Sequence, residues 1–192
     1  MELSSREIPC ALGGPHTVTV MLNLIHSPAT HDPKLPAGVN ARCIKPLYRV
    51  KTSRPLIGPD VTTIFRLDSE VETEKARITW KTFRSSVIEF GGKKFDFDKF
   101  LVPGKPFSKS RLIHVNGETF EWKRGLELYN SQHQLVAKYH RPSNPNSLIQ
   151  IKESQFLDVA DGLDRQLLDI VVVSFVIMWT RERQEAGAQV DS

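Results

Sequence analysis

One apolar segment near the C-terminus constrains the fold more than any other feature of this 192-residue chain. Residues 167–179 read Leu-Leu-Asp-Ile-Val-Val-Val-Ser-Phe-Val-Ile-Met-Trp, with Asp169 and Ser174 as the polar members. The run has 13 residues, whereas a membrane-spanning helix needs roughly 20 apolar residues. The segment therefore predicts an element buried inside a protein core, and no transmembrane segment is expected.

The length and the flanks of this segment decide its secondary structure. Three consecutive valines at 171–173 favour a strand, because branched side chains restrict the rotamers available in a helix. However, no turn signal interrupts residues 164–185, Asp164 precedes the run and Arg181 follows it. These are the charges that a helix dipole favours at each end. We predict a helix over about 164–185 that is apolar on all sides and hence surrounded by protein.

Most of the remaining chain has the pattern of short β-strands. Apolar runs recur at roughly 8–12-residue spacing, which is typical of an antiparallel sandwich or barrel. The candidate strands are 17–22, 44–50, 61–67, 77–83, 87–90, 94–97, 111–115, 118–123, 126–130, 135–139 and 148–151. With the helix, they predict a mostly β fold, namely an antiparallel β-barrel of about 11–12 strands around a buried hydrophobic C-terminal α-helix.

One predicted hairpin has an Asn-Gly turn at 116–117. This dipeptide supplies the two positive φ angles of a type I′ turn, which pairs Val115 with Glu118. In that register the apolar residues share one face, as a half-buried hairpin requires. They are Ile113, Val115, Phe120 and Trp122.

A second hairpin is predicted around the two glycines at 91–92. The same two-residue turn pairs Ile88 with Phe95 on one face and Glu89 with Lys94 on the other. An apolar pair on one side and an opposite-charge pair on the other both stabilise the strands.

The composition predicts one domain with loosely ordered ends. We expect a flexible N-terminus over 1–16, a single domain over 17–185 and a flexible tail over 186–192. A proline-rich loop over 26–42 interrupts the first part of that domain.

Four motifs follow one another in the last third of the chain. They are Glu118-Thr-Phe-Glu-Trp122-Lys, Gly125-Leu-Glu-Leu-Tyr, Leu135-Val-Ala-Lys-Tyr-His-Arg141 and Leu167-Leu-Asp169-Ile-Val-Val-Val-Ser-Phe. Their order resembles the tubby C-terminal-like superfamily, which includes LURP-one-related proteins and phospholipid scramblases, and is most similar to a fungal family of uncharacterised proteins. The resemblance covers roughly 61–183. It implies a barrel of about twelve strands around a C-terminal helix, no known catalytic activity in most members and, from tubby itself, a basic surface for phosphoinositide headgroups. No residue here matches tubby's lipid-binding positions closely enough to transfer a role.

Scramblases have an acidic, calcium-linked stretch just before the helix, where this chain has Asp158, Asp161 and Asp164. The spacing of these aspartates lacks the ligand order of an EF-hand loop and its terminal glutamate. We therefore expect helix capping here, and predict neither a metal site nor a cofactor.

No nucleotide-binding, hydrolase or metalloprotease motif occurs in the sequence, and its six histidines are scattered. Cys10 and Cys43 are the only cysteines, which excludes a disulfide framework and a four-thiolate zinc site. We predict a protein that is not an enzyme. Because no secretory signal is visible, we expect an intracellular location, cytoplasmic or peripheral to a membrane.

The net charge of +4 is concentrated in one stretch, 93–111, which has six basic residues and two aspartates. The candidate residues for binding an anion or lipid are Lys93, Lys94, Lys99, Lys105, Lys109 and Arg111. Phe107 lies among them in a predicted loop, and each basic group near an anionic membrane is worth about 1 kcal/mol. The alternative is that these cations only keep the surface solvated. Nucleic-acid binding is not expected, because no recognition motif accompanies the pI of about 9.1.

Two functions remain open from the sequence. The first is a non-enzymatic intracellular binding or scaffold domain of tubby-like type, with unidentified protein partners, that binds anionic phospholipid headgroups through the basic loop. The second is a β-barrel carrier of a small apolar ligand, which requires that residues 170–179 leave the barrel interior open. Asp169 needs a partner or a place at the barrel rim, because a lone buried carboxylate is not tolerated. We expect Asp169 either near the barrel rim or paired with an inward-pointing basic residue such as Arg111.

Overall fold

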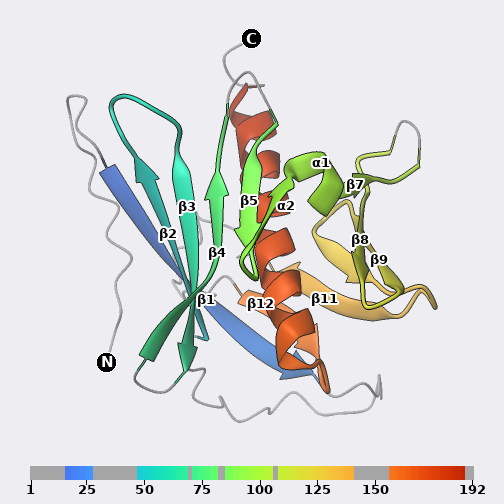
Figure 1. Ribbon diagram of the computed structural model, residues 1–192. Helices are drawn as coiled ribbons and strands as arrows, with labels where there is room; N and C mark the ends of the chain where they lie inside the picture. Colours follow the sequence, from blue (N-terminus) through green and yellow to red (C-terminus); the bar gives the residue numbers. More distant parts are fainter. Residues whose placement is uncertain are drawn as a thin grey trace, which may run out of the picture.

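The computed structural model describes residues 16–27, 47–68, 71–81, 85–105, 108–140 and 156–188, without the side chains of 16–27, 156 and 186–188. Strands dominate this part of the chain (Figure 1). They are β1 (His16–Ser27), β2 (Tyr48–Arg54), β3 (Val61–Asp68), β4 (Val71–Thr79), β5 (Val87–Phe90), β6 (Lys93–Asp96), β7 (Val102–Pro103), β8 (Arg111–Val115), β9 (Glu118–Lys123), β10 (Glu127–Tyr129), β11 (Leu135–His140) and β12 (Phe156–Ala160). The helices are α1 (Phe97–Phe100) and α2 (Arg165–Ala188). The prediction of a mostly β fold with a C-terminal helix is confirmed.

The strands pair in the order β6-β5-β4-β3-β2-β1-β12-β11-β10-β9-β8-β7. Two antiparallel sheets, β1 to β6 and β7 to β12, meet where β1 and β12 pair in parallel, with Asn23 opposite Phe156. At the two ends of this order stand β6 and β7, which do not pair with each other within the described part of the chain. The short helix α1 connects them. The closed barrel therefore stays a prediction.

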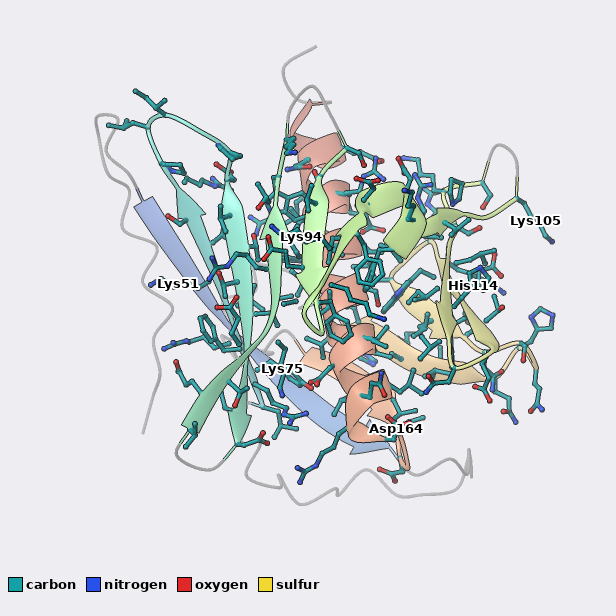
Figure 2. All side chains as sticks on the ribbon, in the orientation of Figure 1. Lys51, Lys75, Lys94, Lys105, His114 and Asp164 are labelled. Carbon is teal, nitrogen blue, oxygen red and sulfur yellow. The ribbon has the colours of Figure 1, made fainter. Side chains whose placement is uncertain are left out.

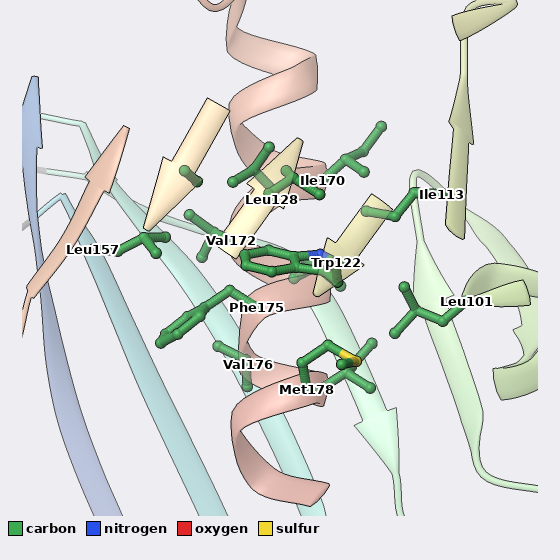
Figure 3. Close-up of a cluster of buried hydrophobic side chains, with 14 of the residues drawn as sticks. Leu101, Ile113, Trp122, Leu128, Leu157, Ile170, Val172, Phe175, Val176 and Met178 are labelled. Carbon is green, nitrogen blue, oxygen red and sulfur yellow. The ribbon is translucent and has the colours of Figure 1, made fainter. Parts of the chain in front are cut away.

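Helix α2 is buried through its middle. Residues 169–178 are all buried, and Figure 1 shows α2 against the strands of both sheets. In Figure 3, Trp122 and Leu128 lie beside Val172 and Phe175 of the helix. The Asp164 side chain accepts a hydrogen bond of 2.8 Å from the Leu167 N–H, which is the N-cap that its position predicts. The predicted helix and its burial are confirmed, and it runs three residues beyond the predicted end.

Polar groups inside this core are hydrogen-bonded. The Trp122 indole donates to Ser174 Oγ at 2.9 Å, and the Ser174 hydroxyl donates to the Val171 carbonyl at 2.9 Å. Each donor is satisfied, so the serine in the middle of the apolar run does not destabilise the helix.

Asp169 is buried and paired, but its partners are Tyr48 and Arg66. Tyr48 Oη donates to Asp169 Oδ1 at 2.6 Å, and Arg66 Nη1 lies 3.2 Å from Asp169 Oδ2. Of the two placements predicted for Asp169, pairing with a basic residue is found, but the suggested partner Arg111 is wrong and Arg66 takes that role. Arg111 lies beside Arg181, and twelve residues separate 169 from 181, which corresponds to about 18 Å along a helix.

Both predicted hairpin registers are confirmed. Val115 pairs with Glu118, and Asn116 and Gly117 have φ angles of 50° and 83°. Glu89 pairs with Lys94, and their side chains form an ion pair of 3.0 Å.

Other boundaries differ from the prediction. Strand β4 covers 71–79 rather than 77–83, and β7, β12 and α1 had not been expected. The candidate strand at 148–151 lies outside the described residues. So do most of the expected flexible ends and proline-rich loop, although β1 includes residues 16 and 26–27 and α2 continues to residue 188.

Candidate functional site

A groove of about 560 Å³ opens near the C-terminal end of α2. Its walls are the β2–β3 loop, the residues between β4 and β5, α1 and the last turns of α2. The charged and polar residues that line it include Asp60, Lys81, Ser86, Asp98, Arg181 and Gln184. Segments far apart in the sequence therefore meet at one end of the fold.

Backbone hydrogen bonds fix the rim of this groove. The Trp80 N–H donates to the Asp60 carbonyl at 2.9 Å, which ties the end of β4 to the β2–β3 loop. The Phe97 N–H donates to the Ser86 carbonyl at 2.9 Å, which ties α1 to the start of β5. Arg54 and Asp60 form an ion pair of 3.4 Å across the base of the loop. These contacts hold the groove walls in place without a ligand.

Two arginines converge on the ring of Phe97 beside the groove. The guanidinium carbon of Arg181 lies 4.5 Å from the ring centroid, and that of Arg111 lies 5.8 Å from it. Burial, followed by the positive charge of Arg181, lowers the pKa of Arg111. Among the described carboxylates, none forms an ion pair with either guanidinium, although Asp98 and Glu185 oppose the shift at longer range. Two guanidiniums in this arrangement favour an oxyanion with several acceptor oxygens.

A third cation lies close to the same turns of α2. Lys109 Nζ lies 2.6 Å from Glu185 Oε2, and this hydrogen bond lowers the pKa of the Glu185 carboxyl. The loop that presents Lys109 is closed at its base, because the Gly104 N–H donates to the Ser110 carbonyl at 3.0 Å. The pair is exposed, at 77% for Lys109 and 54% for Glu185, so it holds the lysine only weakly.

The six basic residues predicted from the sequence do not form one patch. Lys94 pairs with Glu89, and Lys99 pairs with Asp96 at 3.3 Å. Figure 2 shows Lys94 on the β5–β6 hairpin and Lys105 far from it, on the loop after β7. Lys93 is exposed at the start of β6. The structure brings together only Lys109 and Arg111, at the C-terminal end of α2, and Phe107 lies outside the described residues.

Sequence reasoning missed Arg181 and Lys81 as members of this site. Arg181 was interpreted only as a charge that suits the helix C-terminus. Its juxtaposition with Arg111 joins positions seventy residues apart and depends on how α2 packs against α1 and β8, for which the sequence holds no local signal.

The described residues contain no group of three His, Cys, Asp or Glu side chains that could hold a metal ion. Of the three aspartates before the helix, Asp158 is on β12, Asp161 is in the following turn and Asp164 caps α2. In the part of the chain that the structure covers, no helix is long and apolar enough to span a membrane.

The fold and the groove together define a mostly β domain built on a central helix, with a cationic site at one end. The chain belongs to a protein family of unknown function, DUF6593, which matches residues 35–184. The match covers β2 to β12 and α2 as far as residue 184, and it begins after β1. Comparisons with curated proteins and with solved structures found no match.

Proposed function

We propose that this chain is a non-enzymatic binding domain that engages anionic phospholipid headgroups, at the cationic site formed by Lys109, Arg111 and Arg181. The observation that carries the proposal is the convergence of Arg111 and Arg181 on Phe97. The positive charge of Arg181 lowers the pKa of Arg111, so the two guanidiniums repel each other, and a bound phosphate group relieves that repulsion. A phosphate also offers the oxygens that the forked donors of arginine bind.

The exposed lysines support the same proposal. Their ion pairs with Glu185, Glu89 and Asp96 lie at the surface, where such pairs contribute only about 0–1 kcal/mol. A lysine can therefore leave its carboxylate for a lipid phosphate at little cost. Because cytoplasmic leaflets contain anionic lipids, we propose a location peripheral to an intracellular membrane.

The burial of α2 favours this function over a carrier of apolar ligands. Residues 170–178 are buried on every side of the helix, so side chains occupy the space that a carried ligand would need. We further propose a tubby-like arrangement, in which the two sheets curve around α2 as a barrel and α1 bridges β6 and β7. This arrangement is supported by the burial of α2 on all of its faces, because an apolar helix needs protein against each face.

Co-sedimentation with vesicles tests the function. We expect the protein to bind phosphatidylcholine vesicles that contain phosphatidylserine, not vesicles of phosphatidylcholine alone, and to dissociate as salt screens the charges. The variant Lys109→Glu/Arg111→Glu should lose most of the binding. The matched control is Lys51→Glu/Arg124→Glu, which also reverses two charges, at exposed positions on β2 and directly after β9.

Three results would contradict the proposal. One is a wild-type protein that fails to bind anionic vesicles at low salt. Another is a folded Lys109→Glu/Arg111→Glu protein that binds them as well as the Lys51→Glu/Arg124→Glu control. A third is loss of binding in Lys93→Glu/Lys94→Glu, which would place the lipid contact on the β5–β6 hairpin instead of the cationic site.

A further inference from the structure

The loop between β2 and β3 exposes two adjacent large apolar side chains. Leu56 is 70% exposed and Ile57 is 92% exposed at the tip of a sequence that reads Arg-Pro-Leu-Ile-Gly-Pro-Asp. Hairpin tips are usually built from small and polar residues. A single exposed leucine needs no explanation, but two neighbouring apolar residues held in solvent at the end of a hairpin do.

The base of this loop is fixed, so the tip has a defined position. Arg54 and Asp60 pair across the base, and the Trp80 N–H donates to the Asp60 carbonyl. Pro55 and Pro59 flank the tip and restrict its backbone. The loop is therefore held in a shape that presents Leu56 and Ile57 outward.

The tip stands beside the groove. Gly58, Pro59 and Asp60, which follow Ile57 directly, line the groove together with Lys81 and Arg181. Figure 1 shows the β2–β3 loop and the C-terminal part of α2 toward the same end of the molecule. Apolar side chains next to basic groups match the two layers of a membrane surface, where acyl chains lie beneath anionic headgroups.

We propose that Leu56 and Ile57 insert into the interface of an anionic bilayer while the groove lies at the level of the headgroups. This inference rests on the proposed headgroup binding and adds the contact that orients the domain, with the C-terminal end of α2 toward the membrane. Charge complementarity selects a bilayer as the occupant. The cationic site of Lys109, Arg111 and Arg181 lies at this end, where Arg181 lines the groove together with Gly58, which directly follows Ile57. The other exposed large apolar residues of the described chain, Val71 and Leu135, are on β4 and β11, and no residue of either strand lines the groove.

Paired variants separate insertion from charge attraction. We expect Leu56→Ser/Ile57→Ser to bind phosphatidylserine-containing vesicles roughly tenfold or more weakly than wild type, because each buried side chain contributes on this scale. Its control, Val71→Ser/Leu135→Ser, also removes two exposed apolar side chains and should bind as wild type does. Thermal unfolding of each variant confirms that it folds.

Fluorescence gives a second measurement. Brominated lipid in the vesicles should quench the tryptophan fluorescence of Ile57→Trp more strongly than that of wild type, which has three native tryptophans. The variant Val71→Trp should show no added quenching.

The insertion would be overturned if Leu56→Ser/Ile57→Ser bound vesicles as tightly as wild type and Ile57→Trp showed no added quenching. Headgroup binding would stand if binding still depended on anionic lipid. Absence of vesicle binding by wild type would overturn both. A soluble protein that binds through Leu56 and Ile57, with vesicle binding unchanged in the serine variant, would also overturn the insertion.

Discussion

Tyr48 donates a hydrogen bond of 2.6 Å to Asp169, which ties strand β2 to the buried helix across 121 positions of the chain. Arg66 lies 3.2 Å from the other carboxylate oxygen, so the charge of Asp169 is balanced inside the fold. A buried carboxylate requires such partners, because an unpaired one destabilises the folded state by several kcal/mol. This cluster explains how a helix surrounded by protein contains an aspartate.

Replacing Tyr48 with phenylalanine tests this cluster. We expect Tyr48→Phe to lower the free energy of unfolding by about 2 kcal/mol at neutral pH, since a hydrogen bond to a charged group is lost. Burial, with help from Asp169, raises the pKa of Tyr48 well above its ordinary value. In the unfolded chain the Tyr48 hydroxyl ionises near pH 10. The stabilising contribution of its hydrogen bond is therefore present below about pH 10 and is lost as the pH rises further.

The stability difference between wild type and Tyr48→Phe should therefore shrink above about pH 10, because only wild type contains the ionisable hydroxyl. Urea denaturation of both proteins, at neutral pH and one unit above the ordinary tyrosine pKa, measures it. A difference that stays constant over this range would show that Tyr48 ionises as easily in the folded as in the unfolded chain.

A charge in the middle of α2 should unfold the domain. Val173 is fully buried, so Val173→Asp places an unpaired carboxylate in the core and should destabilise the fold by several kcal/mol. The control is Gln166→Asp, an exposed position near the start of the same helix, where a negative charge suits the helix dipole. Thermal unfolding compares the two variants, and a Val173→Asp protein with wild-type stability would contradict a buried helix.

Features of the fold that depend on contacts between residues close in sequence could be predicted, whereas contacts between distant residues could not. The turn at 116–117 fixes a register from two residues, so the pairing of Val115 with Glu118 was predictable. The burial of α2 was also predictable, because an all-apolar helix has no solvated face. The partner of Asp169 was not, because Arg66 lies 103 positions away and only the packing of β3 against α2 selects it over Arg111. The convergence of Arg111 and Arg181 is equally non-local.

The base of the loop that carries Lys109 depends on a glycine. A Cβ atom at Gly104 would overlap the Ser110 side chain and lie 3.1 Å from the Ser110 carbonyl oxygen. We expect Gly104→Ala to destabilise the protein by about 1–3 kcal/mol, because the added methyl group displaces the hydrogen-bonded base of the loop. Limited proteolysis should cut this loop faster than in wild type. Adding Ser110→Gly should restore part of the stability, since it removes the atom that overlaps, and no restoration would place the strain elsewhere.

Releasing Lys109 from its carboxylate should strengthen membrane binding. Glu185→Gln keeps the size of the side chain but removes the charge that pairs with Lys109. We expect the affinity for phosphatidylserine-containing vesicles to rise by about fivefold, because one added net positive charge near an anionic surface contributes about 1 kcal/mol. The matched control is Glu89→Gln, which frees Lys94 from another exposed ion pair, on the β5–β6 hairpin and outside the cationic site. Vesicle co-sedimentation at low salt compares the two variants. A larger gain from Glu89→Gln than from Glu185→Gln would move the lipid contact to that hairpin, because both variants change the net charge equally and differ only in which lysine they release.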